Sequence, residues 1–190
     1  MEIGLYFGSF NPIRVGHLVI ANHILNATNI ERIWIIVSPQ NPFKSDSQLL
    51  NEVKRLSMVK KCISGDKRLI ASNVEFKLSR PSFTSNTLFH LRKDYPRHEF
   101  SIIMGSDSFQ ALDQWKNFQS IIDNHEIFIY RRQNFAVKNK TKARIKILNA
   151  PTLEISSTSI RELIRAGKSI RYLVPDKARE EIEKNQYYKK

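Results

Sequence analysis

IGLYFGSFNPIRVGHL, residues 3–18, sets the expected architecture of this chain. Its apolar residues at positions 3, 5 and 7 alternate with other residues and stop at Gly8, which predicts a first strand that ends in a tight turn. The apolar run that follows Gly16 and His17 predicts a helix. The stretch is therefore expected to be a strand, a glycine-containing turn and the start of a helix.

This arrangement suits a phosphate group, because the backbone N–H groups of the turn and the positive end of the helix dipole face one spot. Gly8 lets a ligand approach the backbone, and Gly16 keeps the helix start free of a side chain. His17 is expected on the first helical turn, where it can donate a hydrogen bond to a phosphoryl oxygen. The stretch matches neither G-x-x-x-x-G-K-[ST] nor G-x-G-x-x-G.

Predicted strands and helices alternate along the rest of the chain. Apolar and β-branched runs predict further strands at 32–38, 69–71, 74–78, 99–104, 127–130 and 145–148. Helical spacing predicts helices at 49–63, from a cap at Thr84 or Ser85 to about residue 93, and around 109–115, and two tail helices separated by Gly167 and Pro175.

Alternating strands and helices predict an α/β fold: a doubly wound, Rossmann-like, mostly parallel sheet with helices on both faces and a small helical C-terminal segment. Residues 1–190 are expected to form a single domain. In such sheets the ligand lies beyond the carboxyl ends of the strands. The loops at 8–16, 39–44, 79–84 and 105–107 should therefore line one crevice.

The composition favours a cytoplasmic protein that binds anions. The net charge of +13 is spread over the whole chain, so it does not distinguish nucleic-acid binding from a site for small polyanions. A single cysteine, Cys62, excludes an internal disulfide and suits a reducing compartment. No apolar run is long enough to span a bilayer, and the N-terminal residues do not have the pattern of a signal peptide.

A second motif, ISSTSIR at residues 155–161, precedes the tail. Ser157 and Thr158 are good helix N-cap residues, and Arg161 adds a charged fork on the first turn. On its own this pattern is more often a capped surface helix than a binding site.

Both motifs resemble those of one nucleotidyltransferase superfamily. GSFNPIRVGHL resembles the signature G-x-F-[DN]-P-x-H-x-G-H or its T-x-G-H variant, and ISSTSIR resembles the accompanying I-S-S-T-x-[IV]-R. The later Tyr172-Leu173-Val174-Pro175 resembles the Y-L-[VI]-P that precedes the final helix of these chains. This sequence departs from the signature at Arg14, where the superfamily usually has His or Thr.

The middle of the chain resembles the bacterial nicotinate-nucleotide adenylyltransferases, which carry P-x-x-P-x-K, P-S-[YF]-T-x-x-T-L and G-[AS]-D-x…W. The matching segments are residues 39–44, 81–88 and 105–115. The resemblance implies transfer of adenylate from ATP to nicotinate mononucleotide, which gives deamido-NAD and pyrophosphate. It implies Mg²⁺ carried by ATP, no metal site in the protein, and no nucleic-acid or membrane partner.

The resemblance also assigns roles to individual residues. The implied catalytic residues are His17, Arg14, Lys44 and Arg161. The implied ATP-binding residues are Gly8, Ser9, Phe10, Gly16, His17, Gly105, Asp107, Ser157, Thr158 and Arg161. The implied nicotinate-mononucleotide-binding residues are Asn11, Thr84, Thr87 and Trp115.

These roles make chemical sense. Trp115 can stack on a pyridine ring, although packing in the core is an equally good explanation without the family. Backbone N–H groups near Thr84 can bind a nicotinate carboxylate, whereas a nicotinamide would oppose donor to donor. Asp107 can accept from a ribose hydroxyl or hold a metal-bound water, and the alternative is a helix cap. Lys44 can reach the triphosphate.

The implied reaction needs no general base, because the attacking phosphate is already largely dianionic at neutral pH. Catalysis then consists of positioning and charge stabilisation, with His17 at the α-phosphate and Lys44 and Arg161 at the other phosphates. Arg14 leaves two hypotheses open. Either Arg14 acts as a phosphate ligand in place of His or Thr, or catalysis is impaired while nucleotide binding is retained.

Other functions stay open at this stage. Another adenylyltransferase of the superfamily, such as pantetheine-phosphate adenylyltransferase, would use T-x-G-H in a shorter chain, and a cytidylyltransferase is a more distant alternative. A basic nucleotide- or nucleic-acid-binding module that lost activity at Arg14 belongs to a different class. The sequence does not determine whether the chain forms a homo-oligomer, and it assigns no role to the basic residues 134–144.

Overall fold

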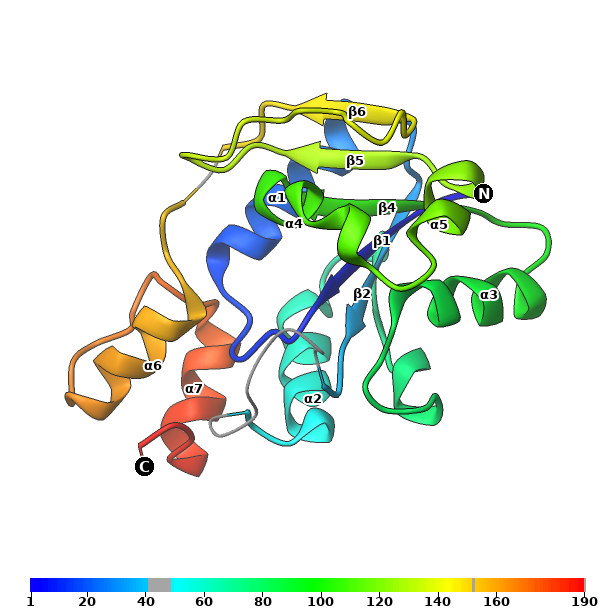
Figure 1. Ribbon diagram of the computed structural model, residues 1–190. Coiled ribbons are helices and arrows are strands. Elements are labelled where there is room, and N and C mark those ends of the chain that lie inside the picture. Colours follow the sequence, from blue (N-terminus) through cyan, green and yellow to red (C-terminus); the bar gives the residue numbers. More distant parts are fainter. Residues whose placement is uncertain (41–48, 152, 190) are drawn as a thin grey trace.

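A computed structural model describes residues 1–40, 49–151 and 153–189 (Figure 1). The strands are β1 (Glu2–Gly8), β2 (Arg32–Val37), β3 (Leu69–Ser72), β4 (Glu99–Gly105), β5 (Ile127–Tyr130) and β6 (Ile145–Leu148). The α-helices are α1 (Val15–Ala27), α2 (Glu52–Ile63), α3 (Thr84–Asp94), α4 (Ser106–Gln110), α5 (Phe118–Asn124), α6 (Ser157–Arg165) and α7 (Asp176–Asn185). Two short 3₁₀ helices are η1 (Val74–Lys77) and η2 (Leu112–Gln114).

The strands form one sheet in the order β3-β2-β1-β4-β5-β6, and every neighbouring pair is parallel. The register places Leu5 of β1 between Trp34 of β2 and Ile102 of β4. The strand order reverses between β1 and β4, so the loops that follow these two strands diverge and leave a crevice. The predicted α/β fold with a parallel sheet is confirmed.

Side chains of each strand alternate between two apolar layers, as the pleat of a sheet requires. Tyr6, Ile103 and Phe128 lie in one layer with residues of α1, α2, α6 and α7. Leu5 and Ile102 lie in the other with residues of α3, α4, η2 and α5. The sheet is therefore covered by helices on both faces, and α7 at the C-terminal end packs beside α2 (Figure 1).

One predicted strand is not formed, and one helix was not predicted. A strand is expected at residues 74–78, but residues 74–77 form η1. There the backbone bonds locally, Phe76 to Asn73 and Leu78 to Glu75, instead of pairing with a strand. The helix that was not predicted is α5, which begins after the helical region expected near residues 109–115.

No described helix is both long enough and apolar enough to cross a membrane.

The packing predicts how stability depends on the sheet. Phe128 in β5 is 0% exposed between the sheet and its helices, so Phe128→Ala should lower the free energy of unfolding by about 3–5 kcal/mol through a cavity. The control is Ile147→Ala on the edge strand β6, where the side chain is 41% exposed and the loss should be below about 1 kcal/mol. Urea titration measures both, and equal losses would contradict this packing.

Candidate active site

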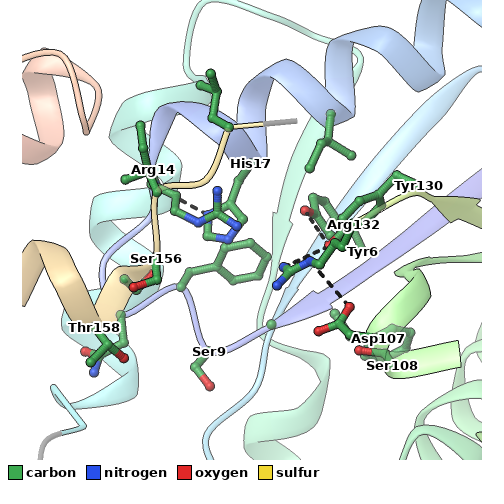
Figure 2. Close-up of a pocket in the computed structure, with 18 of the residues that line it drawn as sticks. Tyr6, Ser9, Arg14, His17, Asp107, Ser108, Tyr130, Arg132, Ser156 and Thr158 are labelled. Carbon is green, nitrogen blue, oxygen red and sulfur yellow. Dashed lines mark hydrogen bonds and ion pairs between the residues drawn. The ribbon is translucent and has the colours of Figure 1, made fainter. Parts of the chain in front are cut away.

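A cavity of about 840 Å³ opens beyond the carboxyl ends of β1 and β4, where the strand order reverses (Figure 2). Figure 2 shows Arg14, His17, Ser156 and Thr158 on one side, and Asp107 and Arg132 on the other. The cavity is lined by these sequence-predicted residues: Gly8, Ser9, Phe10, Asn11, Arg14, His17, Asp107, Trp115, Ser157, Thr158 and Arg161. Lys44 lies outside the described residues.

The loop between β1 and α1 presents His17 to this cavity. The Nδ1 atom of His17 accepts a hydrogen bond from the backbone N–H of Arg14 at 3.2 Å, as a Glu or Gln does in a capping box. An Nδ1 that accepts a hydrogen bond carries no proton, so the ring proton lies on Nε2. The ring packs edge-on against Phe10, with the ring centres 5.0 Å apart. These local contacts thus fix the orientation of the His17 ring and the position of its Nε2 proton.

Arg14 is the residue at which the sequence departs from the expected signature, and the structure accommodates it at Gly16. Arg14 is 6% exposed and lines the cavity. A Cβ atom at position 16 would collide with the Nη1 atom of Arg14. Gly16 therefore provides the space that the guanidinium occupies, and burial lowers the pKa of Arg14 from its ordinary value.

The first turn of α6 is bonded to the loop that carries His17. The Ser157 hydroxyl donates to the Pro12 carbonyl at 3.0 Å, and Arg161 Nη1 donates to the Asn11 carbonyl at 2.9 Å. The N-cap is Ser156, which accepts from the Ser159 N–H at 2.9 Å, so the predicted cap at Ser157 or Thr158 is wrong. Capping by Ser156 frees the next hydroxyl to bind the loop. The starts of α1 and α6 consequently face one cavity.

The opposite wall carries residues that the sequence analysis missed. The Arg132 Nε atom lies 3.3 Å from Asp107 Oδ1, and Arg132 Nη2 donates to the Tyr130 hydroxyl at 3.4 Å. That hydroxyl lies 3.5 Å from the hydroxyl of Tyr6, whose pKa is raised chiefly by burial. Arg132 and Tyr130 lie at the end of a correctly predicted strand, and that position could have identified them.

A second cavity, of about 360 Å³, adjoins the first and shares Gly8, Trp115 and Tyr130 with it. Thr84 and Gly105 line it, as does Lys116. The helix α3 begins at Thr84 with Phe83 as its N-cap, so the predicted cap at Thr84 or Ser85 is wrong. A phenyl ring accepts no hydrogen bond from a helix N–H, so Phe83 provides no side-chain cap for the first turn beside this cavity.

Two predicted substrate contacts are bonded inside the protein. Thr87 is 0% exposed, and its hydroxyl donates to Glu75 Oε1 at 2.9 Å. Asn11 Oδ1 accepts from the Leu50 N–H at 3.1 Å, although the residue also borders the larger cavity. Both side chains thus support the segments around the cavities.

The described residues contain no group of three His, Cys, Asp or Glu side chains that could hold a metal ion. Asp107 is the acidic side chain among the sequence-predicted residues at the larger cavity, and it is paired with Arg132. This donor set suits a cation that arrives bound to phosphate oxygens better than one held in a protein cage.

Comparisons with known proteins agree with this geometry. The cytidylyltransferase-like family matches residues 5–163. The chain is 46% identical to a probable nicotinate-nucleotide adenylyltransferase of Flavobacterium johnsoniae, over 100% of both chains. It is 43% identical to one of Christiangramia forsetii, over 99% of this chain and 98% of the relative. The fold is similar to that of Plasmodium falciparum nicotinic acid mononucleotide adenylyltransferase complexed with NaAD, with a TM-score of 0.84, 22% identity, and 98% and 97% of the chains covered.

The buried carboxyl of Glu75 predicts a pH-dependent stability. Burial raises its pKa above the ordinary 4.5, and hydrogen bonds from Thr87, Ser38 and Ser82 oppose that rise. The folded protein then holds the proton more tightly than the unfolded chain does. Its contribution to stability is therefore complete below pH 4.5 and is lost as the pH rises through the raised pKa.

Glu75→Gln removes this titration. The free energy of unfolding of the variant, minus that of the wild type, should increase as the pH rises from about 4 to about 8. Urea titrations at several pH values measure it, with the exposed Glu180→Gln as the control. A difference that stays constant with pH for Glu75→Gln would contradict the expectation.

Proposed function

The chain belongs to the nicotinate-nucleotide adenylyltransferases of the cytidylyltransferase-like family, and we propose that it transfers adenylate from ATP to nicotinate mononucleotide. The products are deamido-NAD and pyrophosphate. The observation that carries the proposal is the joining of the starts of α1 and α6 at one cavity by the hydrogen bond from Arg161 to the Asn11 carbonyl. Helix starts and an arginine are the groups that a triphosphate needs.

The two adjoining cavities correspond to the two substrates. The larger one takes ATP, with its phosphates between His17, Arg14 and the first turn of α6. The smaller one takes the pyridine ring, which stacks on Trp115. Because Trp115 and Gly8 line both cavities, the attacking phosphate and the α-phosphate of ATP meet at the boundary between them.

The reaction then proceeds by direct displacement. An oxygen of the mononucleotide phosphate bonds to the α-phosphorus of ATP, and the bond from that phosphorus to the oxygen that bridges to the β-phosphate breaks. Pyrophosphate leaves with the electron pair, and no proton moves, because the attacking phosphate is already a dianion. His17 donates its Nε2 proton as a hydrogen bond to the α-phosphate, where negative charge gathers. Arg14 and Arg161 bind the remaining phosphate oxygens.

Preference for the acid over the amide follows from the smaller cavity. The first N–H groups of α3 and the Lys116 ammonium face a substrate carboxylate with donors and positive charge. A nicotinamide would turn an NH₂ donor toward these donors, which costs about 1–3 kcal/mol. Lys116 was missed in the sequence analysis, because a lysine after a tryptophan carries no signal of its own.

Adenylyltransferases that act on ATP generally use a divalent metal ion, and we propose Mg²⁺ for this chain. It would neutralise the charge of the leaving pyrophosphate, and Asp107, which lines the larger cavity, would hold one of its waters. We further propose one domain over residues 1–190 that acts in the cytoplasm on ATP and nicotinate mononucleotide, not on nucleic acid. The single Cys62, which is partly buried, agrees with a reducing compartment.

Pyrophosphate release tests the function. With ATP, nicotinate mononucleotide should give a kcat/KM at least about tenfold higher than the amide nucleotide, because of the donors around the smaller cavity. Lys116→Met should narrow that ratio, whereas Lys60→Met on the exposed face of α2 should leave it unchanged. No release with either nucleotide, together with salt-sensitive binding to DNA or RNA, would show a binding module instead.

Arg14 provides a second test, because its guanidinium lies in the larger cavity and can donate to two phosphate oxygens. Arg14→His should stay within about tenfold of the wild-type kcat, and Arg14→Met should lose about a hundredfold. The measurement is steady-state turnover with ATP and nicotinate mononucleotide. A gain of about a hundredfold in Arg14→His would show that arginine impairs catalysis at this position.

A further inference from the structure

Arg55 is a buried cation that no sequence motif pointed to. It lies on the first turns of α2, and it is 0% exposed. Among the described residues, its guanidinium donates to four backbone carbonyl oxygens: to Ser9 at 2.5 Å, Leu50 at 2.6 Å, Ser38 at 2.8 Å and Pro39 at 3.1 Å. The planar fork of an arginine suits this task, because its donors point in fixed and different directions.

The four carbonyls belong to three separate segments. Ser9 follows β1, Ser38 and Pro39 follow β2, and Leu50 precedes α2. Ser9 lines the larger cavity and Ser38 lines the smaller one. Arg55 itself is not among the described residues that line either cavity. It therefore acts on the site through the backbone and has no direct contact with a substrate there.

The direction of these bonds matters for an anion. A carbonyl oxygen that turned toward the larger cavity would repel the oxygens of a phosphate and would block a backbone N–H from binding it. Arg55, which lines neither cavity, holds the Ser9 carbonyl on the side of the loop away from the larger cavity. The carbonyls of Asn11 and Pro12 are bonded by Arg161 and Ser157 of α6. With these acceptors bonded inside the protein, the loop can turn backbone N–H donors toward the cavity.

The same guanidinium couples the loop to its neighbour in the sheet. Ser9 and Ser38 follow the paired residues Gly8 and Val37, and the Ser38 N–H donates to the Gly8 carbonyl at 2.9 Å. Arg55 donates to the carbonyls of the next residue on each segment, Ser9 and Ser38. This keeps the ends of β1 and β2 together at the point where each begins to line a cavity.

We propose that Arg55 is a positioning residue for adenylyl transfer, which holds the carbonyl oxygens after β1 and β2 away from the triphosphate. The inference rests on the function proposed above. Arg55→Met keeps an apolar side chain of similar length but removes every donor, and Arg55→Lys keeps the charge but has no fork. Both should fold and lower kcat/KM for ATP by about a hundredfold.

Chemical rescue distinguishes this role from a merely structural one. In Arg55→Ala, added guanidinium ion should raise kcat at least about tenfold, whereas sodium chloride at equal ionic strength should not. The matched control is Arg68→Met, since Arg68 bonds to Asp66, Asn22 and Asn26 before the start of β3, at the other end of the strands. Its kcat should equal that of the wild type, with no rescue. Circular dichroism and thermal unfolding show which variants are folded at the assay temperature.

Two results would overturn the proposal. One is a folded Arg55→Lys with kcat/KM within about threefold of the wild type, and the other is an Arg55→Ala that guanidinium does not rescue. If Arg55→Met does not fold, Arg55→Lys and Arg55→Ala still test the proposal. If the wild type releases no pyrophosphate, the proposed function fails, and calorimetric affinity for ATP then tests Arg55 alone. Weaker ATP binding by Arg55→Lys would support the proposal, and unchanged binding would overturn it.

Discussion

Backbone carbonyl oxygens must find donors when they are buried, and this requirement shapes the loop between β1 and α1. Ser9, Asn11 and Pro12 give their carbonyls to Arg55, Arg161 and Ser157. The donors come from two helices far apart in the sequence, α2 and α6, and converge on one short loop. Because every one of these bonds lies within the protein, the loop has a shape before any nucleotide binds, and little ordering is left for the binding step.

The sheet determines where this loop lies. Six parallel strands bring all their carboxyl ends to one edge, and the reversal between β1 and β4 opens the crevice there. Arg14 and His17 enter the crevice from one side, and Asp107 and Arg132 enter it from the other (Figure 2). A cluster of cations at one edge is costly to assemble without an anion, and it becomes favourable when a triphosphate supplies the opposite charge.

The sequence was sufficient for the alternation of strands and helices and for the meeting of the two motifs, because apolar periodicity and glycine positions are local signals. The sequence did not predict features that depend on a bonding partner from another segment of the chain. Arg55 occurs in a helical pattern in which a charged residue ordinarily faces solvent, and only the folded chain shows the carbonyls that surround it. The caps of α3 and α6 each lie one residue from a predicted position. At α6 the neighbouring Ser and Thr residues are chemically equivalent as caps, whereas α3 begins after Phe83, whose side chain accepts no hydrogen bond. Residues 74–77 alternate as a strand would, but the structure turns Glu75 inward to Thr87.

The bond between Arg161 and Asn11 joins residues 150 positions apart. During synthesis the first half of the chain can therefore emerge from the ribosome with its sheet begun but with its nucleotide site unfinished. The nascent protein has a complete set of groups for binding the triphosphate only when α6 has been synthesised and has packed against the loop that contains Asn11. Incomplete chains that end before this helix would consequently compete poorly for cellular ATP.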